Sequence, residues 1–279
     1  MSLLAADFRA FVAAAQKEVR QQRRYPTLFL GQLFWPVLLP ASWVLMGQAY
    51  SGNDPQALAA FAERAGSSSV AVFVFVGYAM YGWLSVLLWG AGTALRQEQM
   101  RGSLEAVFVT PASRLVPLFG PGMATLLPMA VLFASNFLAL RFFFGVSPPI
   151  GAVVQAAVII VLGIPALYAI GTLFAASVLR FGEVGPVVQL IRGMFVLACG
   201  ITFPVAMLPL WAQISAKLMA PTYIVDDIRR VLLRGDTLVD VVGDIAIVLS
   251  LAGLTAILAI AVFRYLETSA RRSGMLGRF

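Results

Sequence analysis

The stretch EQMRGSLEAVFVTPASR, from Glu98 to Arg114, is a charged segment between two long apolar runs. Its apolar residues recur at the spacing of one helical face, and they are Met100, Leu104, Val107 and Phe108. A charged stripe beside them consists of Glu98, Arg101 and Glu105. Thr110 before Pro111 is typical of a helix start, because threonine caps the first amides and proline fits the first helical position. The pattern predicts two short helices that meet at a bend below the bilayer, where a soluble partner can push on them.

The rest of the chain has the composition of an integral membrane protein. It has 279 residues, of which 60% are hydrophobic and 12% are charged, whereas soluble domains are about 25% charged. A helix needs about 20 apolar residues to cross a bilayer core. The runs that qualify are Thr27–Tyr50, Ser68–Leu95, Leu115–Leu140, Ile150–Leu179, Val184–Leu208 and Val239–Phe263. We therefore expect an all-α fold with six transmembrane helices in a single transmembrane domain, residues 1–279.

The charges predict the orientation of these spans. If the N-terminus is cytoplasmic, basic and acidic residues balance on the outer side and the net charge of +7 lies entirely inside. That distribution follows the positive-inside rule and places both termini in the cytoplasm. The charge is thus explained by topology, and we expect no nucleic-acid partner. The predicted location is the cytoplasmic (inner) membrane of a bacterium or archaeon, as a multi-pass protein.

The N-terminal residues predict a helix on the membrane surface, within residues 1–26. Its apolar face consists of Leu4, Phe8, Phe11, Val12, Ala15 and Val19. Basic side chains crowd the other face and suit anionic headgroups. An ordinary basic flank of the first span is the alternative.

A second informative region runs from Gly200 to Gly235. Pro204 and Pro209 interrupt the exit of the fifth run, so we expect short extracellular re-entrant helices over residues 209–238. One short piece is expected at 210–220, and another helix at 223–234. In the latter, Asp226 and Asp227 near the start and Gly235 after the end would suit the helix dipole and the C-cap.

Both regions resemble membrane permease subunits of type-2 ABC transporters, the ABC-2 exporter family. The first matches E-x-x-x-G-T/S-L-E-x-L-x-x-T-P-x-x-R through Glu98, Gly102, Ser103, Leu104, Glu105, Thr110, Pro111 and Arg114, with Val107 in place of a leucine. The second matches F-P-x-x-x-L-P-x-W from Phe203 to Trp211 and D-x-x-R-x-x-L-x-G from Asp227 to Gly235. Between them, Pro221-Thr-Tyr223 is one residue shorter than the family's P-x-T/Y-Y.

The resemblance implies a permease that pairs with a second permease subunit, identical or related, and with separate ABC ATPase (nucleotide-binding) subunits. It assigns contact with the ATPase to residues 96–114 (Glu98, Arg101, Gly102, Ser103, Leu104, Glu105, Thr110, Pro111, Arg114). It assigns an extracellular gate or re-entrant hairpin to Phe203, Pro204, Pro209, Tyr223, Asp227 and Arg230. Our candidates for the translocation path are Phe75, Tyr78, Tyr81 and Arg192, and the default alternative for Arg192 is snorkelling or pairing with Gln189 and Glu183.

The chain carries no catalytic signature of its own. A phosphate-binding loop needs Gly-Lys, but Lys17 follows Gln16 and Lys217 follows Ala216, so we expect ATP and Mg²⁺ to bind only the partner ATPase. With no histidine and one cysteine, Cys199, no Cys/His metal site can form, and we expect no cofactor in this chain and no enzyme activity. Cys199 is expected to be a small packed residue.

Two other classes stay open. An ion-gradient-driven secondary transporter or channel would need buried ionisable residues, and Asp244 is the only acid well inside a span. A membrane-embedded transferase would need clustered acids at a membrane face, and only Asp226 and Asp227 are adjacent. The family carries drugs, lipids, glycolipids and polysaccharide precursors, so the cargo stays undetermined, although the aromatic second span suggests an amphipathic or apolar one.

Overall fold

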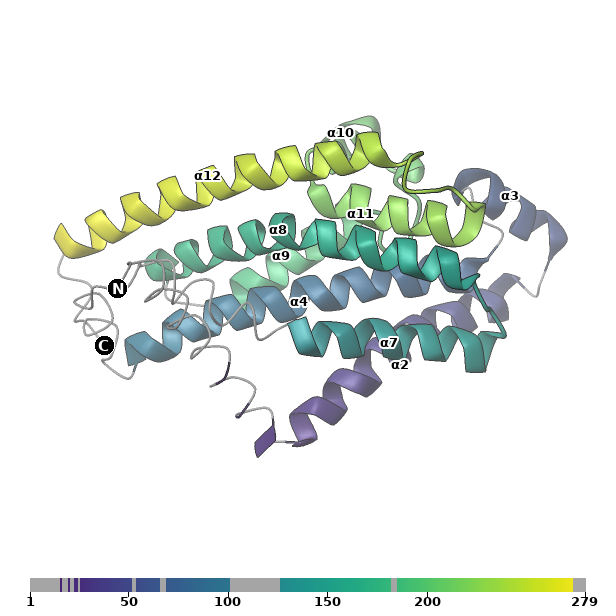
Figure 1. Ribbon diagram of the computed structural model, residues 1–279, viewed down its shortest axis with the longest axis horizontal. Helices are drawn as coiled ribbons and strands as arrows, with labels where there is room; N and C mark the ends of the chain where they lie inside the picture. Colours follow the sequence, from purple (N-terminus) through teal and green to yellow (C-terminus); the bar gives the residue numbers. More distant parts are fainter. Residues whose placement is uncertain are drawn as a thin grey trace.

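The structure is a computed structural model, and it describes residues 16, 20, 23, 24, 26–51, 54–65, 69–100, 126–181 and 185–272. Every regular element within these residues is helical, which confirms the all-α class (Figure 1). The predicted surface helix within 1–26 lies almost entirely outside the described residues. The greater part of the predicted ATPase-contact segment, residues 101–114, also lies outside them.

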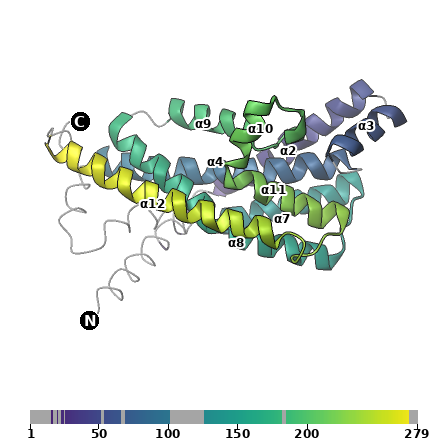
Figure 2. The same cartoon turned by 90° about the horizontal axis from the view of Figure 1, so that it is seen from above.

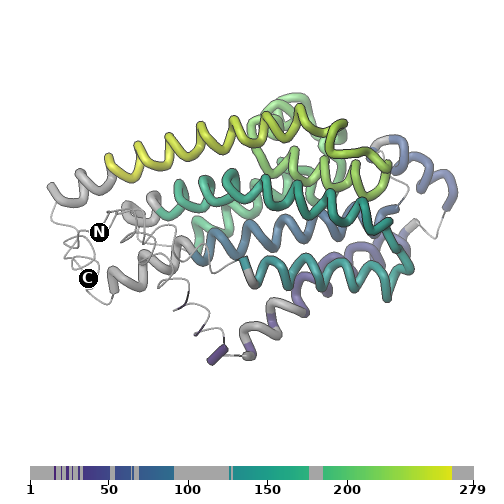
Figure 3. Tube along the Cα trace, in the orientation of Figure 1, coloured from purple at the N-terminus to yellow at the C-terminus, as the bar shows by residue number. Residues whose placement is uncertain are grey.

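Three long helices form the frame. They are α4 (Val70–Met100), α8 (Ile150–Phe181) and α12 (Val242–Arg272), and each contains a stretch long and apolar enough to cross a bilayer. The helix α8 packs between the other two, and α12 runs alongside it for most of its length (Figure 3). Within the most apolar stretch of each helix, the buried share is 67% for α4 and 17% for α12. The central helix is therefore α4, whereas α12 lies at the periphery.

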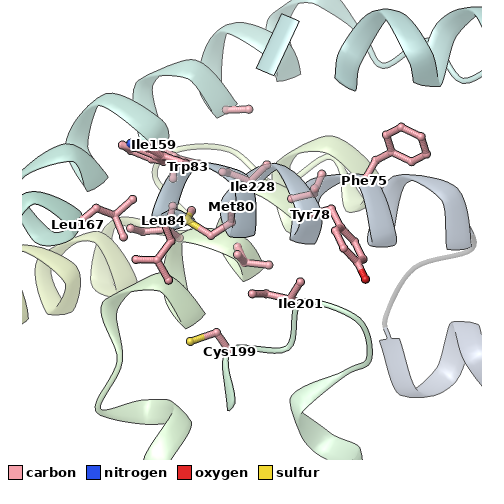
Figure 4. Close-up of a cluster of buried hydrophobic side chains, with 14 of the residues drawn as sticks. Phe75, Tyr78, Met80, Trp83, Leu84, Ile159, Leu167, Cys199, Ile201 and Ile228 are labelled. Atoms are coloured by element: carbon pink, nitrogen blue, oxygen red, sulfur yellow. The ribbon is translucent and has the colours of Figure 1, made fainter. Parts of the chain in front are cut away.

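The core surrounds α4. Trp83, Leu84 and Leu88 of this helix are almost fully buried, and Trp83 lies on the side that faces Ile159 of α8 (Figure 4). Tyr78 points to another side of α4. One helix thus supplies both the hydrophobic core and, on a different face, side chains available for a site.

Two further helices pack against α4 and against each other, α2 (Pro26–Ser51) and α7 (Leu126–Phe144). The helix α2 continues through Pro36 and Pro40. A short helix that the sequence analysis did not predict, α3 (Pro55–Ala65), follows α2. Asp54 caps it by accepting a hydrogen bond of 2.9 Å from the amide of Gln56, and Phe61 packs edge-on against Phe73, with ring centroids 5.4 Å apart.

The fifth predicted span is broken earlier than its prolines suggested. Helix α9 runs only from Gly185 to Ala198, 14 residues or about 21 Å, which is too short to cross the bilayer core as one helix. The chain turns at Gly200, whose φ of +67° lies in the left-handed region that glycine tolerates. The prediction of a continuous span over Val184–Leu208 is therefore wrong in its second half.

After this turn the chain forms an outer hairpin of short helices. They are η1 (Val205–Met207), α10 (Leu210–Lys217), α11 (Ala220–Arg229) and the π-helix η2 (Arg230–Arg234). Their existence was predicted, but α11 begins at Ala220 and carries no acidic residue in its first turn. Asp226 and Asp227 lie in its second half, so they do not serve its N-terminus as we had expected. Gly235 does end the hairpin in the left-handed conformation, with φ of +78°.

Four of the predicted spans correspond closely to helices of the structure, and these helices are α2, α4, α8 and α12. The described part of the third begins at Leu126. That all six runs cross a membrane stays a prediction.

Candidate translocation groove and outer hairpin

A groove with a volume of about 630 Å³ lies between α2, α4, α7 and α9. The side chains that line it from α4 are spaced as one helical face and include Tyr78, Tyr81 and Ser85. Trp35 of α2 lines the groove while 64% exposed, so the groove is open on one side rather than enclosed. Helix α9 closes the opposite wall, on the side of α4 away from α12 (Figure 2).

Three of the four predicted path residues meet in this groove. The rings of Tyr78 and Tyr81 contact each other edge-on, with centroids 5.9 Å apart. The guanidinium carbon of Arg192 lies 4.6 Å from the centroid of the Tyr81 ring, a cation–π contact. Arg192 also donates a hydrogen bond of 3.3 Å to Gln189, as expected. Its Nε is buried and has no hydrogen-bond partner among the described residues.

Phe75, the fourth predicted path residue, lies elsewhere. Its side chain is fully buried and packs against Phe144, with ring centroids 5.3 Å apart. It lines a separate cavity of about 240 Å³ between α4, α7, α8 and the hairpin, whose walls are almost entirely apolar. The structure therefore does not bring Phe75 together with Tyr78, Tyr81 and Arg192.

Four of the predicted hairpin residues lie in the short helices of the hairpin or in the turns before them, and they are Phe203, Pro204, Pro209 and Tyr223. Pro204 and Pro209 immediately precede η1 and α10, a position where the missing amide of proline costs no helical hydrogen bond. The hydroxyl of Tyr223 donates to the carbonyl of Lys217 at 3.0 Å and so ties α11 to α10. Phe203 is half-buried in the turn that precedes η1.

Arg230 is the centre of a charged cluster at the junction of the hairpin and α12. It donates to Asp236 at 2.8 Å and to Asp244 at 2.9 Å, and it lies 3.9 Å from Asp227. The first two are charge-assisted hydrogen bonds, whereas the third exceeds hydrogen-bond length. Arg230 therefore links the π-helix to the start of α12.

Asp227 is the least satisfied member of this cluster. Its side chain is 1% exposed, and neither carboxylate oxygen has a hydrogen-bond partner among the described residues. Burial, followed by repulsion from the carboxylates of Asp244 and Asp226, raises the pKa of Asp227 to about 8. The positive charge of Arg230 opposes this shift, but the closest contacts of Arg230 are with Asp236 and Asp244. Asp227 is thus mostly protonated at neutral pH.

Arg229 is a functional candidate that the sequence analysis missed. Its side chain is buried and donates to the carbonyl oxygens of Phe73, Gly200 and Ile201 at 2.7 to 3.2 Å. It therefore joins α11 to α4 and to the turn after α9. The available signal was spacing, since Val225 and Leu233 lie four residues to either side and place Arg229 on an apolar helical face.

The predicted ATPase contact can be placed only at its first residue. Glu98 lies in the last turn of α4, which continues without a break to Met100. The other members lie outside the described residues, and they are Arg101, Gly102, Ser103, Leu104, Glu105, Thr110, Pro111 and Arg114. Within the described residues, no group of three or more His, Cys, Asp or Glu side chains is arranged to hold a metal ion.

Comparisons with known proteins now give the family. No curated protein matches the chain. The family model described as ABC-2 type transporter matches residues 9–233, which include the groove, most of the hairpin and the segment after α4. The chain therefore belongs to the ABC-2 type transporter family and is a multi-pass permease component of an ABC transporter.

Proposed function

We propose that this chain is the membrane-spanning permease subunit of an ATP-driven exporter, and that the groove of Tyr78, Tyr81 and Arg192 is part of its translocation path. The observation that carries the proposal is the groove itself. It places a half-buried arginine, two tyrosines, Ser85 and Gln189 among apolar side chains, in a bundle that belongs to a transport family. Ligand sites are commonly apolar cavities with a few polar groups that converge on the ligand.

The ATP-driven step is assigned to a separate subunit. This chain lacks the Gly-Lys of a phosphate-binding loop, so the energy enters through contact with an ATPase subunit that binds ATP and Mg²⁺. We place that contact at Glu98 and the residues after it. Two permease subunits, identical or related, and two ATPase subunits complete the transporter.

The helix α4 supplies a mechanical connection between this contact and the groove. Tyr78 and Tyr81 lie on the same unbroken helix that ends at Met100 beside the proposed ATPase contact. Helices move as rigid elements when packed domains shift. Displacement of the Met100 end therefore moves the groove wall directly.

The outer hairpin serves as the gate in this proposal. Arg229 ties it to the backbone of Phe73 on α4, so the same displacement reaches the hairpin. Movement of α4 must either carry the hairpin along or break these buried hydrogen bonds.

One observation favours a proton-driven transporter as the second candidate. Asp227 and Asp244 adjoin the same arginine, and Asp227 is buried with a raised pKa, as proton-coupled transporters require of a relay group. This alternative would use the hairpin cluster rather than the segment after α4.

Reconstitution separates the two candidates. The chain is purified with its co-expressed ATPase, placed in vesicles and assayed for movement of a dansyl-labelled amphiphile. We expect transport to require ATP and to persist when an ionophore collapses the proton gradient. Transport that follows an imposed pH gradient without ATP would refute the proposal and support the second candidate.

A further inference from the structure

We infer that the groove between α2, α4, α7 and α9 binds an amphiphile with an anionic headgroup, and that Arg192 is the headgroup contact. This inference names the ligand class of the site in the proposed function and rests on that function for its role in transport. It stands on three observations: the bonding of Arg192, the chemistry of the groove walls, and the open side of the groove.

The first observation is that Arg192 has unused donors among the described residues, unlike Arg229 and Arg230. Arg229 donates four hydrogen bonds to backbone carbonyls, and Arg230 adjoins three carboxylates. Arg192 makes one hydrogen bond of 3.3 Å to a neutral amide, and within the described residues it has no carboxylate partner. Its Nε is buried without any partner there.

A half-buried guanidinium with unused donors is expected to bind an anion. A buried charge is costly unless it is paired and hydrogen-bonded. The Tyr81 ring contacts the guanidinium, which helps to hold its orientation. Arginine presents a planar fork of donors that matches the oxygen atoms of phosphate, sulfate or carboxylate groups.

The second observation is that the walls around this charge suit a hydrocarbon chain. Apolar side chains from α2, α4 and α7 line the groove, and they are Trp35, Leu39, Val86 and Leu132. Among the described residues, no acidic side chain lines it. In the part of the chain that the structure describes, Arg192 is the one cation of the groove, Gln189 lies beside it, and most of the remaining lining is apolar. This arrangement matches a molecule with one anionic end and one apolar end.

The third observation is that the groove opens to its surroundings. Trp35 and Leu39 line it while 64% and 37% exposed. Arg192 lies seven residues after the first residue of α9, about two helical turns along it. A headgroup at Arg192 can therefore leave its chain extending past Trp35 into the hydrocarbon region, without full enclosure of the ligand.

Binding can be tested on the full-length chain without any ATPase. The chain is placed in nanodiscs of phosphatidylcholine and titrated with three dansyl-labelled dodecyl amphiphiles, which carry a phosphate, a phosphocholine or a trimethylammonium headgroup. Energy transfer from tryptophan to dansyl reports binding. We expect the phosphate form to bind at least tenfold more tightly than either of the others.

Variants assign the preference to the groove. Arg192→Gln should abolish the preference for phosphate, Arg192→Lys should keep part of it, and Trp35→Ala should weaken all three amphiphiles by a similar factor. Arg141→Gln is the matched control, since Arg141 is exposed and outside the groove, and it should bind as the parent does. Size exclusion and thermal melting confirm that each variant is folded.

Several outcomes would overturn the inference. Equal binding of the three amphiphiles, or a phosphate preference that survives in Arg192→Gln, would show that Arg192 is not the headgroup contact. Competition by inorganic phosphate as strong as that of the amphiphile would indicate a soluble anion site instead. Tenfold tighter phosphate binding by Glu183→Gln would show that Glu183, which lies outside the described residues, is the partner of Arg192. The proposed function is tested separately, because ATP-dependent transport of another amphiphile can succeed where this binding fails.

Discussion

Arg229 donates hydrogen bonds of 3.2 and 2.8 Å to the backbone carbonyl of Phe73, a residue 156 positions earlier, and its guanidinium carbon lies 3.4 Å from the centroid of the Phe73 ring. The contact joins the outer hairpin to the central helix. Burial lowers the pKa of Arg229 and Asp226 partly restores it, so the group stays charged at neutral pH. A buried positive charge is thus satisfied by backbone carbonyls rather than by an acid.

Substitution of Arg229 should destabilise the hairpin strongly. Arg229→Gln removes the guanidinium donors from the buried carbonyls of Phe73, Gly200 and Ile201, and we expect a loss of about 3 kcal/mol. Arg229→Lys should keep only part of the stability that Arg229 contributes, because an ammonium cannot reproduce the planar fork of donors. Thermal melting in detergent measures the effect, with Arg141→Gln as the exposed control. A melting temperature equal to the parent's would contradict this role.

Gly77 should not tolerate a side chain. A Cβ at this position would lie 2.0 Å from the carbonyl oxygen of Ile201 and 2.7 Å from Arg229 Nη2, so Gly77→Ala must separate α4 from the turn after α9. We expect poor yield or a melting temperature lowered by several degrees. Gly253→Ala in α12 is the control, since a Cβ there meets nothing within 4 Å and alanine favours a helix. Equal stability of the two variants would refute the close contact.

The stability of the chain should depend on pH through Asp227. Its pKa rises from an ordinary value of 3.8 to about 8 on folding, so the native state binds the proton more tightly than the unfolded state. The contribution of Asp227 to stability is therefore fully present below pH 4 and is lost as pH rises through 8, with a slope of at most ~1.4 kcal/mol per pH unit.

Comparison with Asp227→Asn isolates this effect. The difference in melting temperature between Asp227→Asn and the parent should grow in favour of the variant from pH 5 to pH 8.5. Glu63→Gln is the control, because Glu63 is exposed on α3 and lies outside the charged cluster of Arg230. If the parent and Asp227→Asn show parallel pH profiles, Asp227 is not the titrating group.

Reversal of charge at Glu105 should separate ATP hydrolysis from transport. Glu105 lies on the predicted charged stripe beside Leu104 and Phe108. We expect Glu105→Lys to leave stability within ~0.5 kcal/mol of the parent and to weaken binding of the ATPase subunit by several kcal/mol. Pull-down and efflux assays check this, with Glu63→Lys on the exposed surface of α3 as the control. Full ATPase binding and efflux by Glu105→Lys would make the segment an ordinary loop.

Cysteine labelling should establish the orientation of the chain. In a Cys199→Ala background, an impermeant reagent should mark Ala60→Cys and Leu218→Cys from outside, and should mark Glu18→Cys and Arg272→Cys only after permeabilisation. Leu218 is chosen on the hairpin because its side chain is 72% exposed. Arg230 lies on the same hairpin but is a poor site for a label, because it belongs to the charged cluster. External labelling of Arg272→Cys in intact cells would end the six-span model.

The sequence predicted features that depend on one segment at a time. Runs of apolar residues located α4, α8 and α12, and Gly235 marked the end of the hairpin, because hydrophobicity and left-handed backbone are local properties. The break of the fifth run at Gly200 instead of Pro204 was missed. A glycine inside an apolar run does not reveal that its backbone will adopt a positive φ.

The two adjacent arginines show the limit most clearly. Arg229 and Arg230 look alike in the sequence, yet neighbouring residues of a helix point about 100° apart. One is buried against the carbonyl of Phe73, and the other adjoins Asp236 and Asp244. Their partners lie in other helices and loops. Only the packed structure therefore distinguishes Arg229, which is buried and joins two helices, from Arg230, which belongs to the charged cluster.

The unequal burial of α4 and α12 sets how freely each helix can change over evolutionary time. Many side chains of α12 are exposed, so exchanges among leucine, isoleucine and valine at positions such as Leu254 or Ile257, which are 65% and 69% exposed, alter little besides the lipid contact. Exchanges in the α4 core, at Trp83 or Leu88, must preserve volume and shape as well as hydrophobicity. Homologous chains should therefore drift in α12 while the order of large and small residues along α4 persists.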